Sequence, residues 1–477
     1  MRLIRRFAIV ALCLAAAPMW AQPVFRGTDI LPAEEFATRR ATLMSRIGDG
    51  VIVIQGATER GGEEPFRQNN QFFYLTGLVE PRAFAVIDGA SKRTSVFVLP
   101  RNERRELRNY GPALVPGMET ARLLGVDEAL ARDEFAGVVA KLAGRTIYTP
   151  LREEVLGSQS SGDPTKLATA NRDDPWDGRP SRESVFRQKL QAAAPGSTLK
   201  DLDPLIDAMR AVKSPREIAL IREATRITGL GIMEVMRDTK PGMREYELQA
   251  VSEFVFTKHG AYGPSYFALV ATGRNMFYTH YHANTAVLQD GDLVQYDYAP
   301  DYKYYQSDVT RIFPANGKFT PRQREFYTAY LRLYQALLTS ITVHITPGEA
   351  VKRSLAKMDR ILAEFKFTDP KIKAAAERFV EGYRSRTNAR SLGHMVGLEV
   401  HDVGGLQAET FEPGRIFTIE PAMQIEDERF GIRLEDMILI TEKGYDNMSA
   451  FVPVEIDEIE KMMREPGLSD AALRLPK

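Results

Sequence analysis

The sequence is poor in several residue types on which a protein of this size often depends. It contains a single cysteine, Cys13, so no disulfide can form within one chain. Its 63 basic and 63 acidic residues balance, so no global field draws the chain to nucleic acid or to an anionic membrane. No apolar run beyond the N-terminus is long enough to span a bilayer. Stability and partners must therefore come from local features.

The N-terminus has the pattern of a secretory signal. Three arginines precede an apolar run over residues 7–20, and the small residue Ala21 follows. This run is short for a transmembrane helix, so we predict cleavage near Ala21 and export to the periplasm or the medium, with a membrane anchor as the alternative. Lipid attachment at Cys13 is disfavoured because Leu12, not a small residue, precedes it. Removal of residues 1–21 leaves no cysteine and no stable membrane anchor.

Residues 30–200 are predicted to form an α/β domain. Short apolar strands, "GVIVIQG", "AFAVIDG", "SVFVLP" and "RTIYTP", alternate with helical patterns, of which the longest covers 117–144. Residues 158–183 are rich in Gly, Pro, Ser and Asp, which predicts a surface insertion without a catalytic role.

A second domain is predicted over residues 205–455, followed by a C-terminal tail at 456–477. Its first helix begins in "KSPREIALIREATRI", where Ser214 is the expected N-cap and Pro215 the first helical residue. Glu217, three residues after Ser214, completes a capping box.

Within this domain, the stretch "QYDYAPDYKYYQSDVTRIF" (295–313) reads as two β-strands joined by a turn. A turn centred on Tyr302 and Lys303 would place Asp297 directly opposite Asp308. Like charges in that position are destabilising, so the pattern predicts a cation between the two carboxylates.

Two more acids interrupt apolar strands, and they lack obvious partners. Glu420 ends the strand in "GRIFTIEPAM", and Glu435 lies in "FGIRLEDMILIT" with Arg433 on the same face. Burial of a carboxylate costs several kcal/mol unless a cation compensates. One such acid alone would indicate a salt bridge. Four acids, together with a histidine from the clusters "THYHAN" or "SLGHMVGLEVHDVGG", favour a pair of divalent ions and a dinuclear metallohydrolase.

These motifs also carry a family resemblance. In their order along residues 205–450, "QYDYAPDYKYYQSDVTRIFP", "SLGHMVGLEVHDVG", "FEPGRIFTIEPAM" and "GIRLEDMILIT" resemble the metal-binding motifs of the aminopeptidase P, prolidase and methionine aminopeptidase superfamily. "FRQNNQFFYLTGLVEP" resembles a signature of the smaller domain of aminopeptidase P and prolidase, which methionine aminopeptidase lacks. The implied fold is an α+β pita-bread catalytic domain preceded by a smaller α/β domain of the creatinase/prolidase N-terminal type.

The resemblance implies a role for each matching residue. Two divalent metal ions, manganese with zinc or cobalt as alternatives, are expected to activate a water molecule. Glu420 would also transfer a proton, Arg433 would support the site, and His280 and His401 would hold the substrate and stabilise the tetrahedral intermediate. The implied metal ligands are Asp297, Asp308, His394, Glu420 and Glu435, of which Asp308 and Glu435 would bridge both ions.

The expected activity is removal of the first residue from peptides with proline second. A prolidase, which cleaves Xaa-Pro dipeptides, shares the same ligands and remains an alternative. An inactive binding protein on this fold, and an exported interaction module whose acids form ordinary salt bridges, are further alternatives. The expected partners are a peptide substrate and further copies of the chain, in a dimer or tetramer whose N-terminal domain reaches a neighbouring site.

Two departures from the family pattern bear on specificity. Arg390 stands where relatives have a histidine, and Tyr298 and Ala299 follow Asp297 where relatives have Ala-Gly. We hypothesise that Arg390 binds a substrate carboxylate, which would favour short peptides.

Overall fold

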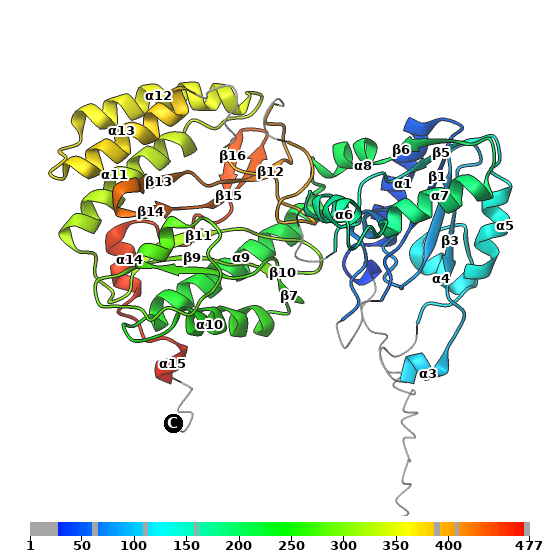
Figure 1. The fold of residues 1–477 in the computed structure, drawn as a ribbon, viewed down its shortest axis with the longest axis horizontal. Coiled ribbons are helices and arrows are strands. Elements are labelled where there is room, and N and C mark those ends of the chain that lie inside the picture. The colour runs from blue at the N-terminus through cyan, green and yellow to red at the C-terminus, as the bar shows by residue number, and fades with distance from the viewer. Residues whose placement is uncertain are drawn as a thin grey trace, which may run out of the picture.

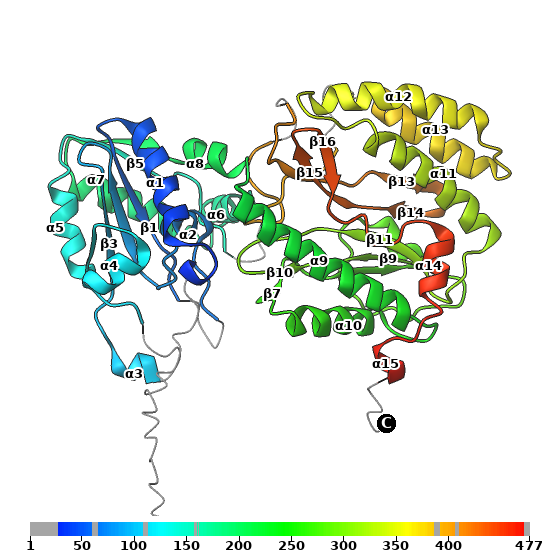
Figure 2. The ribbon, with the colours of Figure 1, turned by 180° about the vertical axis from the view of Figure 1, so that it is seen from behind.

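The structure, a computed structural model, describes residues 27–59, 65–107, 113–156, 160, 162–385, 392–405 and 410–471. The predicted signal (1–21) and Arg390 lie outside the described residues. None of the helices that it describes is long and apolar enough to cross a membrane. Two domains of the predicted classes lie side by side, the N-terminal one in blue through cyan to teal-green and the second in green through yellow to red (Figures 1 and 2).

The N-terminal domain is built on one mixed sheet in the order β4-β3-β2-β1-β5-β6. Strands β1, β2 and β3 pair antiparallel, whereas β4, β5 and β6 join in parallel. Buried Val, Ile and Phe side chains on both faces explain the continuous apolar strands of the sequence. The strands are β1 (Val51–Gln55), β2 (Phe84–Asp88), β3 (Arg93–Val98), β4 (Glu128–Ala131), β5 (Thr146–Thr149) and β6 (Thr198–Asp201).

The helical pattern predicted over 117–144 is interrupted in the structure. Residues 128–131 form β4, which pairs in parallel with β3 and is an edge strand of the sheet. The prediction of helix at these four residues was therefore wrong. The helices of this domain are α1 (Ala33–Ile47), α2 (Asn70–Thr76), α3 (Glu103–Arg105), α4 (Met118–Leu124), α5 (Phe135–Ala140), α6 (Asp163–Asp173), α7 (Arg182–Ala193) and α8 (Asp203–Arg210).

The second domain opens with α9 (Pro215–Asp238), which begins as the sequence predicts. The Ser214 hydroxyl accepts a hydrogen bond from the Glu217 backbone N–H, and the Glu217 side chain accepts one from the Ser214 backbone N–H. This capping box fixes the start of a 24-residue helix. Figure 2 shows α9 running from the domain boundary along the second domain.

Short antiparallel sheets form the interior of the second domain. Their orders are β11-β9-β8, β12-β15-β16, β13-β14 and β10-β7. The strands are β7 (Gly263–Pro264), β8 (Leu269–Thr272), β9 (Leu293–Asp297), β10 (Pro300–Asp301), β11 (Thr310–Pro314), β12 (Ile416–Ile419), β13 (Ala422–Ile425), β14 (Phe430–Arg433), β15 (Asp436–Thr441) and β16 (Gly444–Asn447).

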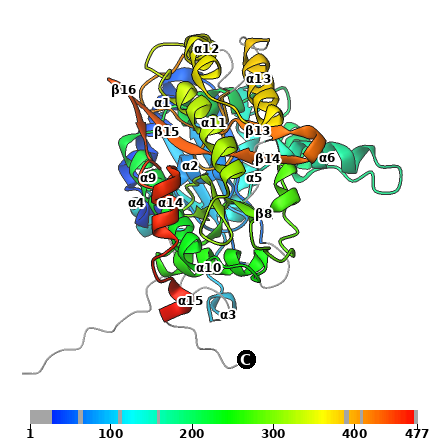
Figure 3. The ribbon, with the colours of Figure 1, turned by 90° about the vertical axis from the view of Figure 1, so that its left-hand side faces the viewer.

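Helices cover these sheets from two sides. In Figure 1, α10 lies below the strands, and α11, α12 and α13 lie above them. Figure 3 shows the same arrangement from the side. The ligand-bearing strands are therefore enclosed between two helical layers. The remaining helices are α10 (Glu245–Lys258), α11 (Pro321–Leu338), α12 (Pro347–Glu364), α13 (Pro370–Arg384), α14 (Ile456–Met462) and α15 (Leu468–Ala471).

Part of the segment predicted as a C-terminal tail is ordered helix. Ile456 and Ile459 of α14 are buried in the core. The backbone N–H groups of Leu468 and Ser469 donate to Glu234 and Asp238 of α9. Residues 456–471 therefore belong to the folded domain.

Candidate metal centre

The hairpin that carries the two aspartates has a different register from the predicted one. Asp297 of β9 pairs with Thr310 of β11, not with Asp308. The turn is centred on Lys303 and Tyr304, both with positive φ, which shifts the partner of Asp297 by two residues. Because side chains alternate with period two, this shift leaves both aspartates on one face.

Both aspartates contribute to a compact cluster of carboxylates around one histidine. The Nε2 atom of His394 lies 3.5 Å from Asp308 Oδ2, 3.4 Å from Glu420 Oε1 and 3.7 Å from Glu435 Oε1. Asp297 joins Asp308 and Glu435 in a second group whose oxygens lie within 4.8 Å of one another. The structure thus brings together all five residues named as ligands from the sequence.

The position of His394 depends on a glycine and on its own backbone. A Cβ atom on Gly393 would lie 2.2 Å from the carbonyl oxygen of Thr418, so only glycine permits this approach to β12. The Nδ1 atom of His394 lies 3.2 Å from the carbonyl oxygen of Met395. An N–H at Nδ1 leaves Nε2 unprotonated and directed at the carboxylates, as a metal-binding imidazole requires.

A tyrosine that no sequence pattern singles out links the two aspartates. The Tyr266 hydroxyl lies 2.6 Å from Asp297 Oδ1 and 2.6 Å from Asp308 Oδ1. Its segment is held beside β9 because the Ser265 N–H donates to the Ala299 carbonyl at 2.8 Å. Tyr266 is therefore a buried donor that orients both carboxylates.

Arg433 compensates only part of the negative charge. Its Nη2 donates to Asp297 Oδ2, so its direct hydrogen-bond partner is Asp297 and not Glu435, the acid that the family resemblance implies as a bridging ligand. Thr310 Oγ1 donates to Glu435 Oε2 at 2.8 Å. Among the described residues, Glu435 Oε1 is buried and has no hydrogen-bond donor.

The electrostatics of the cluster fit bound cations. Burial, reinforced by the neighbouring carboxylates, raises the pKa of Asp308 and of Glu435 well above the ordinary range. Such groups are stable as anions only when cations compensate them. Oxygen donors with one imidazole and no thiolate suit a first-row divalent metal. The residues present therefore fit a metal centre, and the orphaned Glu435 Oε1 offers a free ligand atom.

Two histidines lie beside the cluster. The His401 ring contacts the His394 ring at a centroid distance of 4.1 Å. Burial lowers the pKa of His401 to about 3, with further contributions from His394 and His280. His401 is therefore a neutral hydrogen-bonding group. The exposed His280 lies close enough to act on His401 electrostatically.

The N-terminal domain contributes to the surroundings of His401. Ser160 Oγ lies 2.9 Å from His401 Nδ1, and Asp163, the first residue of α6, acts on the same imidazole. Helix α6 lies at the boundary between the domains in Figure 1 and projects from the molecule in Figure 3. Segment 158–183 was predicted to be a surface insertion without a catalytic role, and domain packing brings its Ser160 to His401.

Buried ion pairs hold the backbone next to His401. Arg210 Nη2 pairs with Glu399 Oε1 at 2.6 Å and also with Asp402 Oδ1. Lys213 Nζ lies 3.2 Å from Asp402 Oδ2, and Asn70 of α2 donates to Glu399 Oε1 at 3.2 Å. The loop carrying His401 is thus fastened to the N-terminal domain and to the segment that joins the two domains.

Tyr298, which differs from the family pattern, lies outside the carboxylate cluster. Its hydroxyl donates to Glu253 Oε1 of α10 at 2.9 Å, and its ring stands edge-on to Tyr266 at 6.3 Å. Tyr298 therefore supports Tyr266 from behind. Arg390, proposed from the sequence to bind substrate, lies outside the described residues.

Two family models match the chain. Residues 219–442 match metallopeptidase family M24, and residues 36–148 match the aminopeptidase P N-terminal domain. Both expected family assignments are thereby confirmed.

Relatives align over nearly the whole chain. The Xaa-Pro aminopeptidase of Escherichia coli (strain K12) is 32% identical over 455 residues, covering 90% of this chain and 97% of the relative. The Xaa-Pro aminopeptidase of Haemophilus influenzae is 31% identical, covering 91% and 98%. A Xaa-Pro dipeptidase of Pongo abelii is 26% identical, covering 91% and 94%. The structure of aminopeptidase P from E. coli with the inhibitor Pro-Leu has a TM-score of 0.71 and 31% identity, covering 90% and 98%.

Proposed function

The chain belongs to the Xaa-Pro aminopeptidases of metallopeptidase family M24, and from this premise we propose that it removes the N-terminal residue from peptides with proline second. The observation that carries the proposal is the convergence of four carboxylates on His394 Nε2 and Tyr266, beside His280 and His401. The greater identity to aminopeptidases than to dipeptidases favours this activity over prolidase.

The proposed cofactor is a pair of divalent ions, with manganese favoured by the oxygen-rich donor set. Asp297, Asp308, His394, Glu420 and Glu435 would hold them. When bound, such ions polarise a carbonyl group and generate a nucleophilic water near neutral pH.

The remaining chemistry belongs to side chains of the chain. Glu420 is the cluster carboxylate with the most exposed side chain, 26%, and the Thr418 hydroxyl lies 3.5 Å from its Oε1. It is placed to accept a proton from the attacking water and to return it to the leaving nitrogen. The neutral His401, with Ser160 at Nδ1, presents Nε2 to the substrate carbonyl oxygen as negative charge develops. Arg433 and Tyr266 keep the carboxylates oriented during the reaction.

The proposal is tested by metal content and by activity before and after chelation. We expect two ions per chain, hydrolysis of Ala-Pro-Ala but not Ala-Ala-Ala, loss of hydrolysis on chelation, and recovery with Mn²⁺. Faster hydrolysis of Ala-Pro than of Ala-Pro-Ala would instead favour prolidase. A purified protein without metal, or one whose activity is indifferent to chelation, would contradict the proposal.

Export and assembly are further parts of the proposal. The arginines and the apolar run before Ala21 support export to the periplasm or the medium, and the family resemblance supports a homo-oligomer. Cell fractionation with N-terminal sequencing, and light scattering of the purified protein, test these two points.

A further inference from the structure

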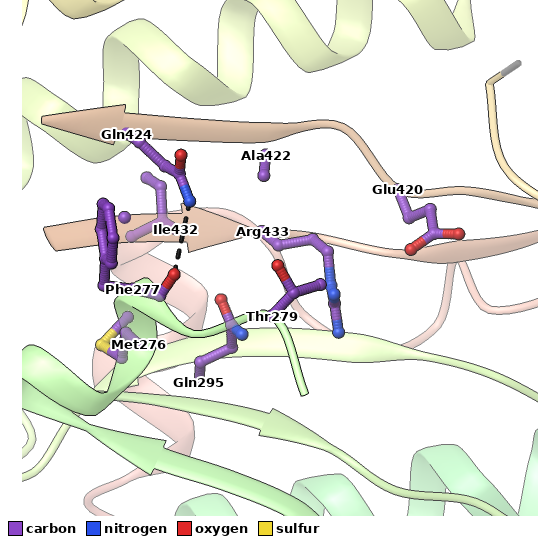
Figure 4. A pocket seen from close by; sticks show the side chains of 10 residues that line it. Met276, Phe277, Thr279, Gln295, Glu420, Ala422, Gln424, Ile432 and Arg433 are labelled. Atoms are coloured by element: carbon purple, nitrogen blue, oxygen red, sulfur yellow. Dashed lines mark hydrogen bonds between the residues drawn. The ribbon is translucent and has the colours of Figure 1, made fainter. Parts of the chain in front are cut away.

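The loop that carries His280 lies beside the metal centre. It covers residues 273–286 and, apart from one short 3₁₀-helix at its start, has no regular secondary structure. Thr279, the residue before His280, lines a cavity together with Glu420 and Arg433, and Figure 4 draws Thr279 next to Arg433. Because this loop has no ladder of backbone hydrogen bonds to define its path, side-chain contacts must hold His280 in place.

The first part of the loop is anchored from β13. Gln424 Nε2 donates to the Phe277 carbonyl oxygen at 3.4 Å, the bond drawn in Figure 4. Met276, which also appears there, is 3% exposed and packs into the core. These contacts hold the short 3₁₀-helix, which ends before His280.

The second anchor is one buried carboxylate, that of Glu245, the first residue of α10. Its Oε1 accepts hydrogen bonds from the Thr272 N–H at 2.9 Å, the Thr272 hydroxyl at 2.9 Å and the Asn275 amide at 3.1 Å. Its Oε2 accepts from the Tyr281 hydroxyl at 2.8 Å and from the Ala286 N–H at 3.0 Å. A single side chain thus binds the beginning, the middle and the end of the loop.

The chemistry of this anchor requires a carboxylate. All five hydrogen-bond donors are uncharged, and hydrogen bonds to an ionised acceptor are stronger than those between neutral groups. The position of Glu245 at the N-terminus of α10 adds a favourable interaction with the helix dipole. A neutral amide could not replace it, because its NH₂ group would face two or three of the same donors.

The hydrogen bond to Tyr281 brings this anchor to His280. Tyr281 is the next residue in the chain, so fixing its hydroxyl restricts the backbone of His280. The Nδ1 atom of His282 lies 2.9 Å from the His280 carbonyl oxygen and restricts it further. His280 is close enough to His401 to act on its imidazole electrostatically. The contacts of Glu245 therefore determine where the His280 imidazole stands relative to the metal centre.

We propose that Glu245 is a positioning residue for His280, because its carboxylate fixes loop 273–286 and thereby places the imidazole beside the metal centre. The inference rests on the proposed function, under which His280 holds the substrate. Glu245 itself contacts neither substrate nor metal.

Two variants test this assignment through activity. Glu245→Gln should lower kcat/KM for Ala-Pro-Ala about 10- to 100-fold at unchanged metal content, since a displacement of about 1 Å in a group that holds the substrate has an effect of this size. Tyr281→Phe removes only the hydrogen bond next to His280 and should lower kcat/KM by about 3- to 10-fold. It keeps the proposal testable if Glu245→Gln fails to fold. Tyr278→Phe, at an exposed position of the same loop, is the matched control and should change kcat/KM by less than about twofold.

A double-mutant cycle separates positioning from a general loss of stability. In a His280→Ala background, Glu245→Gln should change kcat/KM by less than about twofold, because the group through which it acts is gone. Equal losses in the wild-type and His280→Ala backgrounds would overturn the assignment. Wild-type kcat/KM in both Glu245→Gln and Tyr281→Phe would overturn it as well.

Amide hydrogen exchange of the Mn²⁺-loaded protein tests the anchor without reference to activity. The amides of Thr272 and Ala286 donate to Glu245, so peptides that contain them should exchange at least about tenfold faster in Glu245→Gln, while the core strands of the domain keep their rates. Failure to hydrolyse any Xaa-Pro peptide would contradict the proposed function, yet the exchange rates would still decide the anchor. Wild-type exchange rates in Glu245→Gln would overturn it.

Discussion

Replacement of Tyr266 by phenylalanine should weaken metal binding without disturbing the fold. The hydroxyl reaches Asp297 and Asp308 at 2.6 Å each. It has a single proton, so it supplies one charge-assisted hydrogen bond shared between two oxygens. Tyr266→Phe removes this donor and leaves the ring in place.

The size of the effect follows from that one bond. A hydrogen bond to a charged group contributes about 1.5–3 kcal/mol, and every 1.4 kcal/mol is tenfold in affinity. The carboxylates must be ionised to bind a metal, and loss of the donor disfavours their ionised form. Mn²⁺ affinity should therefore fall by about 10- to 100-fold, in line with the loss seen when the hydrogen-bond partners of metal ligands are removed.

The assay is a Mn²⁺ titration followed by calorimetry, with urea unfolding of the metal-free protein beside it. Tyr298→Phe is a matched control, since Tyr298 is also buried and donates to a carboxylate, Glu253, that lies outside the cluster. The control should lose comparable stability and keep its Mn²⁺ affinity. If Tyr266→Phe binds Mn²⁺ as tightly as the wild type, or if both variants weaken it equally, Tyr266 does not orient the ligands.

Three further outcomes are expected. Because burial raises the pKa of Asp308 and Glu435, the stability that they contribute is complete below their ordinary pKa of about 4 and is lost as pH rises through the raised values. Urea unfolding of the chelated protein should therefore give a free energy of unfolding that decreases from about pH 4 toward neutral pH, because Asp308 and Glu435 must ionise in a buried site. Saturating Mn²⁺ should suppress this decrease. Ser160→Ala should lower kcat about 2- to 10-fold, because it removes the hydrogen bond to His401 Nδ1, whose net contribution is modest. Ser160→Thr should retain kcat, and both variants should retain the metal content. An unchanged kcat in Ser160→Ala would contradict the importance of this contact. Arg210→Met leaves two buried carboxylates without their main cation and should cost about 3–5 kcal/mol of unfolding free energy, whereas a loss under 1 kcal/mol would show that this network is dispensable.

The acids of the cluster could be selected from the sequence because each violates a local rule. Asp297, Glu420 and Glu435 stand in or next to strands of Val, Ile, Leu and Phe, where a carboxylate is costly. A local pattern can reveal such a conflict, but it cannot give the geometry of its solution. The register of the hairpin shows this limit, since Lys303 and Tyr304 adopt the positive φ that a two-residue turn usually assigns to Asn-Gly.

The residues that sequence reasoning missed reach the site through contacts between segments that are distant in the sequence. Tyr266 lies in "GPSYFALV", where nothing distinguishes it from a core aromatic residue until the β7–β10 and β8–β9 pairings bring it beside β9. Ser160 is separated from His401 by 241 residues, and its segment has the composition of an ordinary loop. Neither contact leaves a periodicity or a charge imbalance in the chain, because both are created by packing between distant elements.

The carboxylate cluster and the neighbouring His401 therefore depend on different parts of the molecule. The side chains of the metal cluster, with Tyr266 and Arg433, all come from the second domain, so metal affinity should depend mainly on that domain. His401 is held instead from across the domain boundary, by Ser160 directly and by the contacts of Arg210 and Asn70 with its loop. A disturbance of this boundary should lower turnover while metal content stays constant. Under the proposed function, every metal ligand thus lies in one domain, whereas the groups that hold His401 come from the other.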